Sequence, residues 1–221
     1  MFYEVVQANR YFDRNRRYAD IDWNSLDQIV DAFERRLLDW YFDPAKELAK
    51  NVHFAFAVMA LNCLLIDTLS QFAYGNASSS PAAFKQFIRD NLPQYSGRLL
   101  KPIQHHDGNR TCSLADVADV LYHGYRCGIL HQAHISPYGL IDPGASQAVR
   151  QSPSGYVKYK SSGSDCAAVV VNPRALLEDL SGVFEGYLRD LKNPDPRHGP
   201  LRTKFKDKFS RSFGLDVRSA A

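Results

Sequence analysis

The chain lacks the paired cysteines of a zinc or dithiol redox site. Its cysteines are scattered with no Cys-x-x-Cys pair and no zinc-knuckle spacing: Cys63, Cys112, Cys127 and Cys166. Cys63 stands in an apolar helical run, where a buried and reduced thiol is expected. We therefore expect neither a metal nor a cofactor.

Long uninterrupted apolar runs are also absent. The longest ones are broken by His53, Asn62 and Asp67, so no segment is expected to span a membrane. Residues 1–17 have no long apolar stretch and no small-residue cleavage site, and thus do not have the pattern of a secretory signal. Both absences predict a cytoplasmic protein with no membrane partner.

A strong net charge is the third absence. The formal charge is only +3 over 221 residues, so the chain is not a polycation. Positive charge is concentrated near the end, because residues 197–221 hold seven Lys and Arg against two Asp. This segment suits contact with a polyanion, although an ordinary solvated helix has the same pattern. The candidate RNA contacts there are Lys204, Lys206, Lys208 and Arg211.

Helical periodicity dominates what is present. The apolar spacing predicts helices over residues 25–40, 45–74, 81–92, 113–135, 173–191 and 201–213. Short alternating runs predict strands over residues 138–141, 148–151, 156–160 and 167–171, and residues 93–111 are expected to be irregular. The predicted fold is mainly α, with a small β-hairpin or meander inserted at about residues 136–171, before the penultimate helix. Residues 1–192 would form one helical domain, and residues 193–221 a linker and a basic C-terminal helix.

The helix expected over residues 113–135 carries the candidate site. Ser113 is a suitable N-cap, with Asp116 three residues later. At about 100° per residue, one arc of a straight helix collects the polar side chains Asp116, Asp119, His123, Arg126, Cys127, His131 and His134. The opposite arc is an ordinary apolar core face. Packing alone does not require such a polar strip, and the functional site is therefore placed on it.

Arg126 and His131 together suit chemistry on a phosphodiester. A guanidinium can clamp phosphate oxygens and stabilise charge that builds on phosphorus. An imidazole titrates near neutrality and can move a proton to or from a ribose oxygen. Simpler alternatives stay open: Arg126 could pair with Asp116 or Asp119, and His131 could be a helix-end histidine. The histidines and Cys127 could ligate a metal only with a partner chain, because one straight helix cannot surround a tetrahedral ion.

The sequence Arg126-Cys-Gly-Ile-Leu-His131 resembles the HEPN family, whose defining feature is an Arg-x4–6-His motif on a late helix. The resemblance covers the helical frame from about Ala45 to Leu191. It implies a HEPN-like helical bundle that pairs as a homodimer with its motif helices facing each other. It also implies a metal-independent endoribonuclease that cleaves RNA by 2′-OH attack, in a prokaryotic toxin–antitoxin or defence setting.

The resemblance further implies roles for single residues. Arg126 and His131 would be catalytic together with their copies in a second subunit, and Asp67 would be the supporting acid from an earlier helix. Further support would come from His123, Cys127 and His134. An antitoxin or a nucleotidyltransferase-type partner is implied as well, but Ala133 stands where some members carry a modifiable Tyr. Cys127 also departs from the family, in which Asn, Asp or His often follows the Arg.

Two other functions remain open at this stage. The chain could be a non-catalytic HEPN-like module whose Arg126 and His131 hold RNA or a nucleotide without cleaving it, and Cys127 favours this alternative. It could also be a structural dimer whose polar strip lines the subunit interface. The Arg126 and His131 pair favours the ribonuclease.

Overall fold

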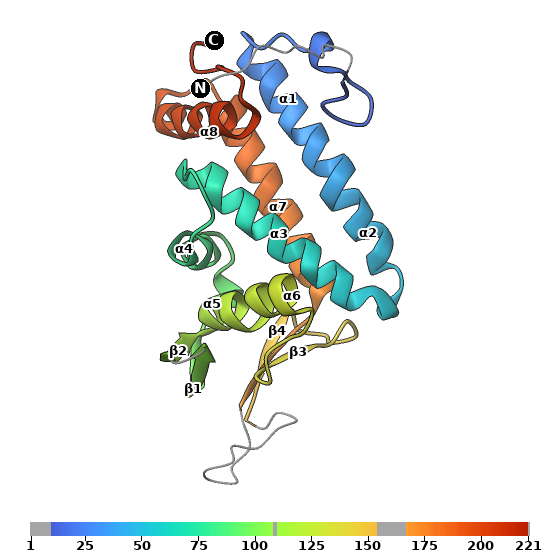
Figure 1. Ribbon diagram of the computed structural model, residues 1–221, viewed down its shortest axis with the longest axis vertical. Coiled ribbons are helices and arrows are strands. Elements are labelled where there is room, and N and C mark those ends of the chain that lie inside the picture. The colour runs from blue at the N-terminus through green and yellow to red at the C-terminus, as the bar shows by residue number, and fades with distance from the viewer. Residues whose placement is uncertain (1–9, 108–109, 154–166, 221) are drawn as a thin grey trace. The chain divides into compact units, whose positions relative to one another are not determined.

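A computed structural model describes residues 10–107, 110–153 and 167–220. Its helical content confirms that the protein is mainly α, with two small sheets (Figure 1). The chain divides into two compact units. The first comprises Met1–Pro44, Asp67–Ser79 and Ser181–Ala221, and the second comprises Ala45–Ile66 and Ser80–Leu180. The segment expected to be an appended C-terminal helix thus belongs to the first unit, together with the N-terminal helix.

The first unit is helical. Its elements are the 3-10 helix η1 (Tyr18–Asp20), α1 (Leu26–Leu37), the π-helix η2 (Leu38–Phe42), the start of α2 (Asp43–Ala49), the ends of α3 (Ala55–Tyr74) and α7 (Pro173–Lys192), η6 (Pro196–His198) and α8 (Gly199–Phe213). Asp43-Pro44 lies inside one uninterrupted helix, because α1, η2 and α2 follow one another directly, and the break predicted between residues 40 and 45 is absent. Pro44 has no N–H to donate, and it comes just after the π-helical segment, where the regular α-helical hydrogen bonding is already interrupted.

Aromatic side chains form the core of the first unit. The α1 stripe predicted from periodicity is buried, and Ser25 caps the helix by accepting a hydrogen bond from the Gln28 amide. Phe33 on this stripe lies 4.4 Å from the ring of Phe72 and 5.3 Å from the ring of Phe205. Phe205 is fully buried. The helix α8 is therefore a part of this core, and its burial supplies stability to the unit.

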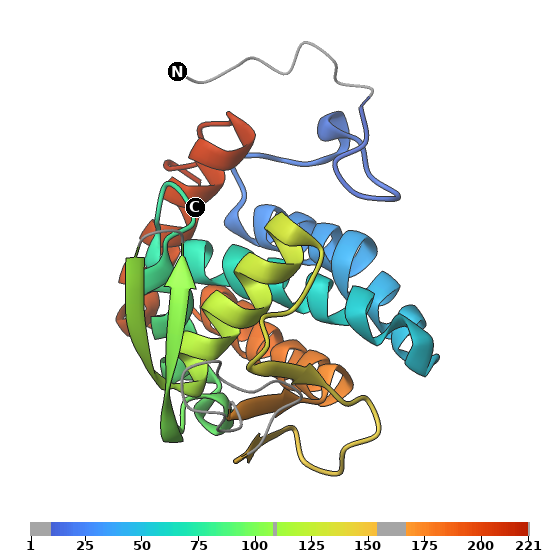
Figure 2. The same cartoon turned by 60° about the horizontal axis from the view of Figure 1, so that its bottom comes forward.

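The second unit contains both sheets (Figure 2), and the Gln151 side chain joins them by accepting a hydrogen bond of 2.6 Å from the Leu100 amide and donating one of 2.8 Å to the Arg98 carbonyl. Its elements are the end of α2, η3 (Val52–Phe54), the start of α3, α4 (Pro81–Asn91), η4 (Pro93–Tyr95), β1 (Arg98–Asp107), β2 (Arg110–Asp116), α5 (Val117–Val120), the π-helix η5 (Leu121–Arg126), α6 (Cys127–Gln132), β3 (Gly139–Ile141), β4 (Val149–Ser152), β5 (Ala168–Val171) and the start of α7.

Local capping signals placed two helices of this unit correctly. Ser80 accepts a hydrogen bond of 3.0 Å from the Ala83 amide, with Pro81 at the first position of α4. Asn172 accepts one of 3.0 Å from the Arg174 amide at the start of α7. These caps satisfy amides that a helix N-terminus leaves without intrahelical acceptors.

The strands predicted over residues 138–141, 148–151 and 167–171 are present as β3, β4 and β5. β4 and β5 pair antiparallel, as in the predicted hairpin, but β3 pairs parallel to β5, so the order β3-β5-β4 is not that of a meander. The central strand β5 has all four residues buried, which suits its uninterrupted apolar sequence. The strand predicted over residues 156–160 lies outside the described residues.

Residues 93–111 are not irregular, as had been predicted from their polarity. Most of them form β1 and the start of β2, which pair as an antiparallel hairpin that includes His105 opposite Cys112. The hairpin presents Ile103 and Leu114 to the core, and both side chains are about 1% exposed. Polar residues occupy most other positions, so the alternation that identifies a strand is weak in the sequence.

The helix α3 is only partly the buried helix that was predicted. Met59, Cys63, Leu65 and others are buried, but four apolar side chains just before the helix or in its first half are exposed: Val52, Phe54, Phe56 and Leu64. The segment Val52–Tyr74 is long and apolar enough to cross a membrane, contrary to the sequence prediction, and 44% of its most apolar window is buried. The core helix of a soluble protein meets the same criteria. A cytoplasmic location stays a prediction.

Replacing Phe205 by Ala tests whether α8 is integral to the core. The substitution removes a fully buried ring that contacts Phe33 and Phe72, so we expect the free energy of unfolding to fall by about 3–5 kcal/mol in urea denaturation. Thr203→Ala, at an exposed position of the same helix, should change it by less than about 0.5 kcal/mol. Equal, small effects of the two substitutions would show that α8 is an appendage.

Candidate functional site

The helix with the candidate motif begins later than predicted. Asp116, and not Ser113, is its N-cap, because the Asp116 carboxylate accepts a hydrogen bond of 2.8 Å from the Asp119 amide. Ser113 lies in β2. The helix then runs through α5, η5 and α6 and ends at Ala133, which has a left-handed backbone with φ of 53°. His134 therefore lies beyond the helix.

A π-helical segment interrupts the regular turn just before the motif. The segment η5 covers Leu121–Arg126 and has hydrogen bonds that span one more residue than those of an α-helix. Its side chains therefore do not follow the 100° spacing on which the single polar arc was drawn. The prediction of one continuous arc is wrong, and each of its residues has to be located separately.

The hydroxyl of Tyr125 fixes the π-helical segment to the three-stranded sheet. It accepts a hydrogen bond of 2.9 Å from the Leu140 amide and lies 2.7 Å from the carbonyl oxygens of both Leu140 and Val169. The side chain is fully buried. One phenol thus links η5 to the backbones of β3 and β5 and anchors the residue that precedes Arg126.

Two glycines let the following chain approach this helix closely. A Cβ at Gly124 would lie 2.7 Å from the Tyr138 ring, and one at Gly128 would lie 2.5 Å from the carbonyl oxygen of His134. Both distances are shorter than real Cβ contacts. The Gly124 carbonyl accepts a hydrogen bond of 3.0 Å from the Ser136 amide. Sequence reasoning missed these positions, although two glycines four residues apart on a helix are a signal of close packing.

Arg126 and His131, which the sequence analysis selected as a pair, are in contact in the structure. Arg126 Nη1 lies 2.9 Å from His131 Nε2. Because a guanidinium only donates hydrogen bonds, Nε2 is the acceptor and the ring proton of a neutral His131 is on Nδ1. Arg126 is half-buried with its guanidinium 5.7 Å from the Tyr122 ring centroid, and His131 is exposed. The pair is therefore open to a ligand.

The two aspartates proposed as alternative partners of Arg126 pair with α4. Arg89 contacts Asp116 at 2.8 Å, and Lys85 contacts Asp119 at 2.9 Å. Burial raises the pKa of Asp119, but the Ala115 amide, Lys85 and Arg89 outweigh it and hold the pKa below its ordinary value. These ion pairs fasten the start of the motif helix to α4.

Comparisons with protein-family models, curated proteins and solved structures each find no match. The HEPN resemblance therefore stays a prediction that rests on the motif residues of the sequence.

The remaining polar residues of the predicted strip occupy different surroundings. The His123 ring lies 4.8 Å from that of His105 on β1, whose Nδ1 is 2.6 Å from the Tyr138 hydroxyl. His105 is thus half-buried beside the motif helix. Cys127 is half-buried, and His134 is exposed. Within the described part of the chain, no three His, Cys, Asp or Glu side chains are grouped to hold a metal.

Asp67 belongs to the first unit, whereas Arg126 and His131 belong to the second. Its side chain is 7% exposed and accepts a hydrogen bond from the Ser79 hydroxyl. That arrangement suits a buried structural carboxylate, and a supporting role in the candidate site stays a prediction.

The basic residues selected on α8 are largely used inside the first unit. Lys208 is 6% exposed, which corrects its selection as a phosphate contact for RNA. Lys206 donates to the Ala220 carbonyl at 2.9 Å, and Arg211 donates to the Gly75 carbonyl at 2.6 Å. Lys204 and Arg211 are exposed, so these two of the four remain accessible to a polyanion.

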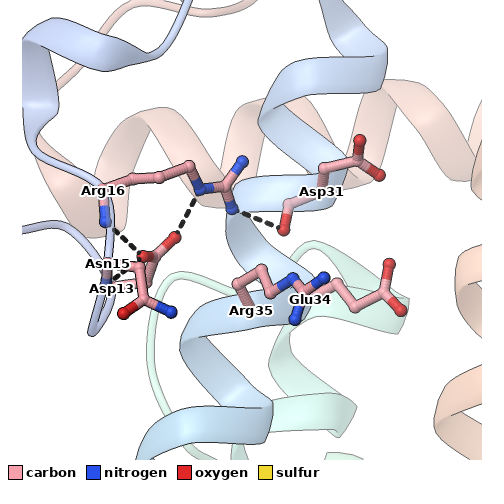
Figure 3. A pocket seen from close by; sticks show the side chains of 6 residues that line it. All are labelled: Asp13, Asn15, Arg16, Asp31, Glu34 and Arg35. Atoms are coloured by element: carbon pink, nitrogen blue, oxygen red, sulfur yellow. Dashed lines mark hydrogen bonds and ion pairs between the residues drawn. The ribbon is translucent and has the colours of Figure 1, made fainter.

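A polar recess of about 490 Å³ in the first unit is internally compensated (Figure 3). Arg16 contacts the buried Asp13 carboxylate at 2.7 Å and donates to the Asp31 carbonyl at 2.9 Å. Lys192 pairs with the side chains of Asp31, at 2.7 Å, and Glu34, at 3.1 Å. Each acid in the recess has a basic partner, so its charges need no ligand.

Replacing Tyr125 by Phe removes only the hydroxyl that links η5 to the sheet. The Leu140 amide loses its acceptor in a buried place, so we expect the free energy of unfolding to fall by about 1–3 kcal/mol in urea denaturation. Tyr11→Phe, at a side chain that is 58% exposed, should have almost no effect. An unchanged midpoint for Tyr125→Phe would contradict the anchoring role.

Asp119 should contribute to stability in a pH-dependent way. Its folded pKa lies below the unfolded value of about 3.9, so its contribution is present above pH ~4 and is lost as the pH falls through the folded pKa. Unfolding measured in urea between pH 5 and 2 should show a smaller loss of stability for Asp119→Asn than for the unchanged protein. Parallel pH profiles would refute this assignment.

Proposed function

We propose that the protein is a metal-independent endoribonuclease of HEPN type, with Arg126 and His131 as its catalytic pair. One observation carries the proposal: the 2.9 Å contact between Arg126 Nη1 and His131 Nε2 at an accessible position. The contact brings together a permanent cation and a proton acceptor, which are two of the groups that phosphodiester cleavage by a ribose hydroxyl requires.

An RNA phosphate would exchange places with His131 on the guanidinium. Phosphate oxygens are stronger acceptors for Arg126 than a neutral imidazole, because the hydrogen bonds then join opposite charges. His131 Nε2 is released by this exchange and accepts the proton of the adjacent 2′-OH. The 2′-oxygen forms its bond to phosphorus while the bond from phosphorus to the 5′-oxygen breaks, and Arg126 stabilises the added charge. The products are a 2′,3′-cyclic phosphate and a 5′-hydroxyl.

The leaving 5′-oxygen needs a proton from an acid, which cannot be the His131 that acts as the base. In the proposed homodimer, His131 of a second copy supplies it, so that one imidazole acts as base and the other as acid. The four exposed apolar side chains just before α3 or in its first half are surface that a partner could cover: Val52, Phe54, Phe56 and Leu64. A toxin or defence role with an antitoxin or nucleotidyltransferase-type partner is part of the same proposal and rests on the HEPN resemblance alone.

A non-catalytic RNA- or nucleotide-binding module is the second candidate. It is favoured by the same contact, since the lone pair of His131 Nε2 is occupied by Arg126 and is not available as a base without a bound phosphate. Such a module would keep the phosphate on Arg126 without transferring a proton.

Replacing His131 or Arg126 by Ala tests the proposal. Either change removes one half of the pair, so we expect the rate of RNA cleavage in EDTA to fall by at least about 100-fold. Cleavage of a labelled RNA is followed by gel electrophoresis, and circular dichroism checks that each variant is folded.

His106→Ala and Arg150→Ala are matched controls, because both residues are exposed and lie outside the pair. They should cleave at the unchanged rate. Cleavage that persists in His131→Ala would contradict the ribonuclease assignment. RNA binding without cleavage that is lost in Arg126→Ala would support the binding module instead.

A further inference from the structure

A second cavity in the first unit has cationic and aromatic walls. It has a volume of about 240 Å³, is bordered by α1, η2, the end of α3 and α8, and is partly open to solvent. Its lining residues are Phe33, Arg36, Leu37, Tyr41, Thr68, Gln71, Phe72, Lys208, Ser212 and Phe213. Two of these are cationic and none is acidic. The cavity is separate from the Arg126 and His131 pair, which belongs to the second unit.

Lys208 brings a buried charge to this cavity. Its side chain is 6% exposed, and its ammonium donates to Gln71 Oε1 at 2.8 Å and to the Ala77 carbonyl at 3.1 Å. Both acceptors are neutral, and no carboxylate among the residues that the structure describes forms an ion pair with it. Burial, followed by the charge of Arg211, lowers the pKa of Lys208. A buried cation without an anion is unfavourable unless something compensates it.

Arg36 places a second cation at the same cavity. Its guanidinium lies 5.0 Å from the Phe12 ring centroid and 5.3 Å from that of Phe213, and it donates to the Phe12 carbonyl. These contacts hold the planar group in one orientation, while its acceptors are again neutral. Asp67 on α3 does not line the cavity, and its carboxylate accepts a hydrogen bond from the Ser79 hydroxyl.

The polar recess of Figure 3 provides an internal comparison. Its acids and bases neutralise one another through ion pairs, as described above. In the cavity at Lys208 the positive charges of Lys208 and Arg36 are not neutralised by any lining residue, because the other lining side chains are uncharged. An anionic ligand would supply the negative charge that balances them.

We propose that this cavity binds a small organic anion that carries one planar ring, with its phosphate or carboxylate held by Lys208 and Arg36. The charged end would accept hydrogen bonds from the ammonium and the guanidinium. The planar part would pack against the aromatic lining, where Tyr41 and Phe213 are partly exposed. The volume accommodates a ligand of about the size of a mononucleotide or smaller, and excludes a polymer from the interior.

Isothermal titration calorimetry on the full chain tests the proposal with defined probes. Adenosine 5′-monophosphate represents a ring with a phosphate, and benzoate represents a ring with a carboxylate. Inorganic phosphate represents the charge alone. We expect at least one ring-bearing anion to bind, with inorganic phosphate at least about tenfold weaker because it lacks the ring contacts. Heat from neither ring-bearing probe, or equal affinity for inorganic phosphate, would overturn the proposal.

Two sets of variants locate the binding. Lys208→Met should weaken the binding by about 10- to 100-fold through loss of a charged donor, and Lys204→Met, on the exposed side of α8, should not.

Ser212 is exposed and lines the cavity, so Ser212→Glu introduces a repelling charge without disturbing the core, and Ser212→Gln is its uncharged control. The second pair keeps the test decisive if Lys208→Met is unfolded. Binding that is unchanged in Ser212→Glu would place the ligand elsewhere and refute the proposal.

Discussion

The hydroxyl of Tyr125 joins the motif helix to two strands, and the geometry of the candidate site depends on this link. The residue lies in a π-helical segment, so an additional residue is accommodated just before Arg126. Gly124 and Gly128 on either side permit the close return of the chain toward β3. Ion pairs from Lys85 and Arg89 hold the start of the helix to α4. Arg126 and His131 therefore project from a helix that is fixed at its start and at its middle.

Local signals in the sequence predicted the elements that depend on neighbouring residues. The caps at Ser80 and Asn172 and the apolar stripe of α1 are such cases, because each involves residues within one or two turns. The pairing of Arg126 with His131 was also accessible, since five residues on a helix are within the reach of an Arg side chain. The π-helical segment and the β1–β2 hairpin were not predicted. They depend on contacts such as Tyr125 with Val169 and His105 with Tyr138, which are 44 and 33 residues apart.

The basic residues near the C-terminus show why composition is a poor guide to function. The sequence alone predicts that four basic side chains face solvent and are available to a polyanion: Lys204, Lys206, Lys208 and Arg211. In the structure, Lys208 is buried and Arg211 donates to the backbone, because α8 packs into the aromatic core through Phe205 and Phe209. The same fold that removes Lys208 from the surface places its charge in a cavity. The helix α8 was expected to bind RNA, and in our proposal it instead lines a small-molecule site.

The central claim is that His131 and Arg126 act on RNA through its 2′-hydroxyl. The most direct test uses one labelled RNA strand in EDTA beside the same strand with 2′-deoxyribose at the mapped cleavage position. Attack by the 2′-oxygen predicts a 2′,3′-cyclic phosphate end from the first strand and no cleavage at that position in the second. Equal cleavage of both strands, or a product with a 5′-phosphate, would contradict the account, because water and not the ribose would then be the nucleophile.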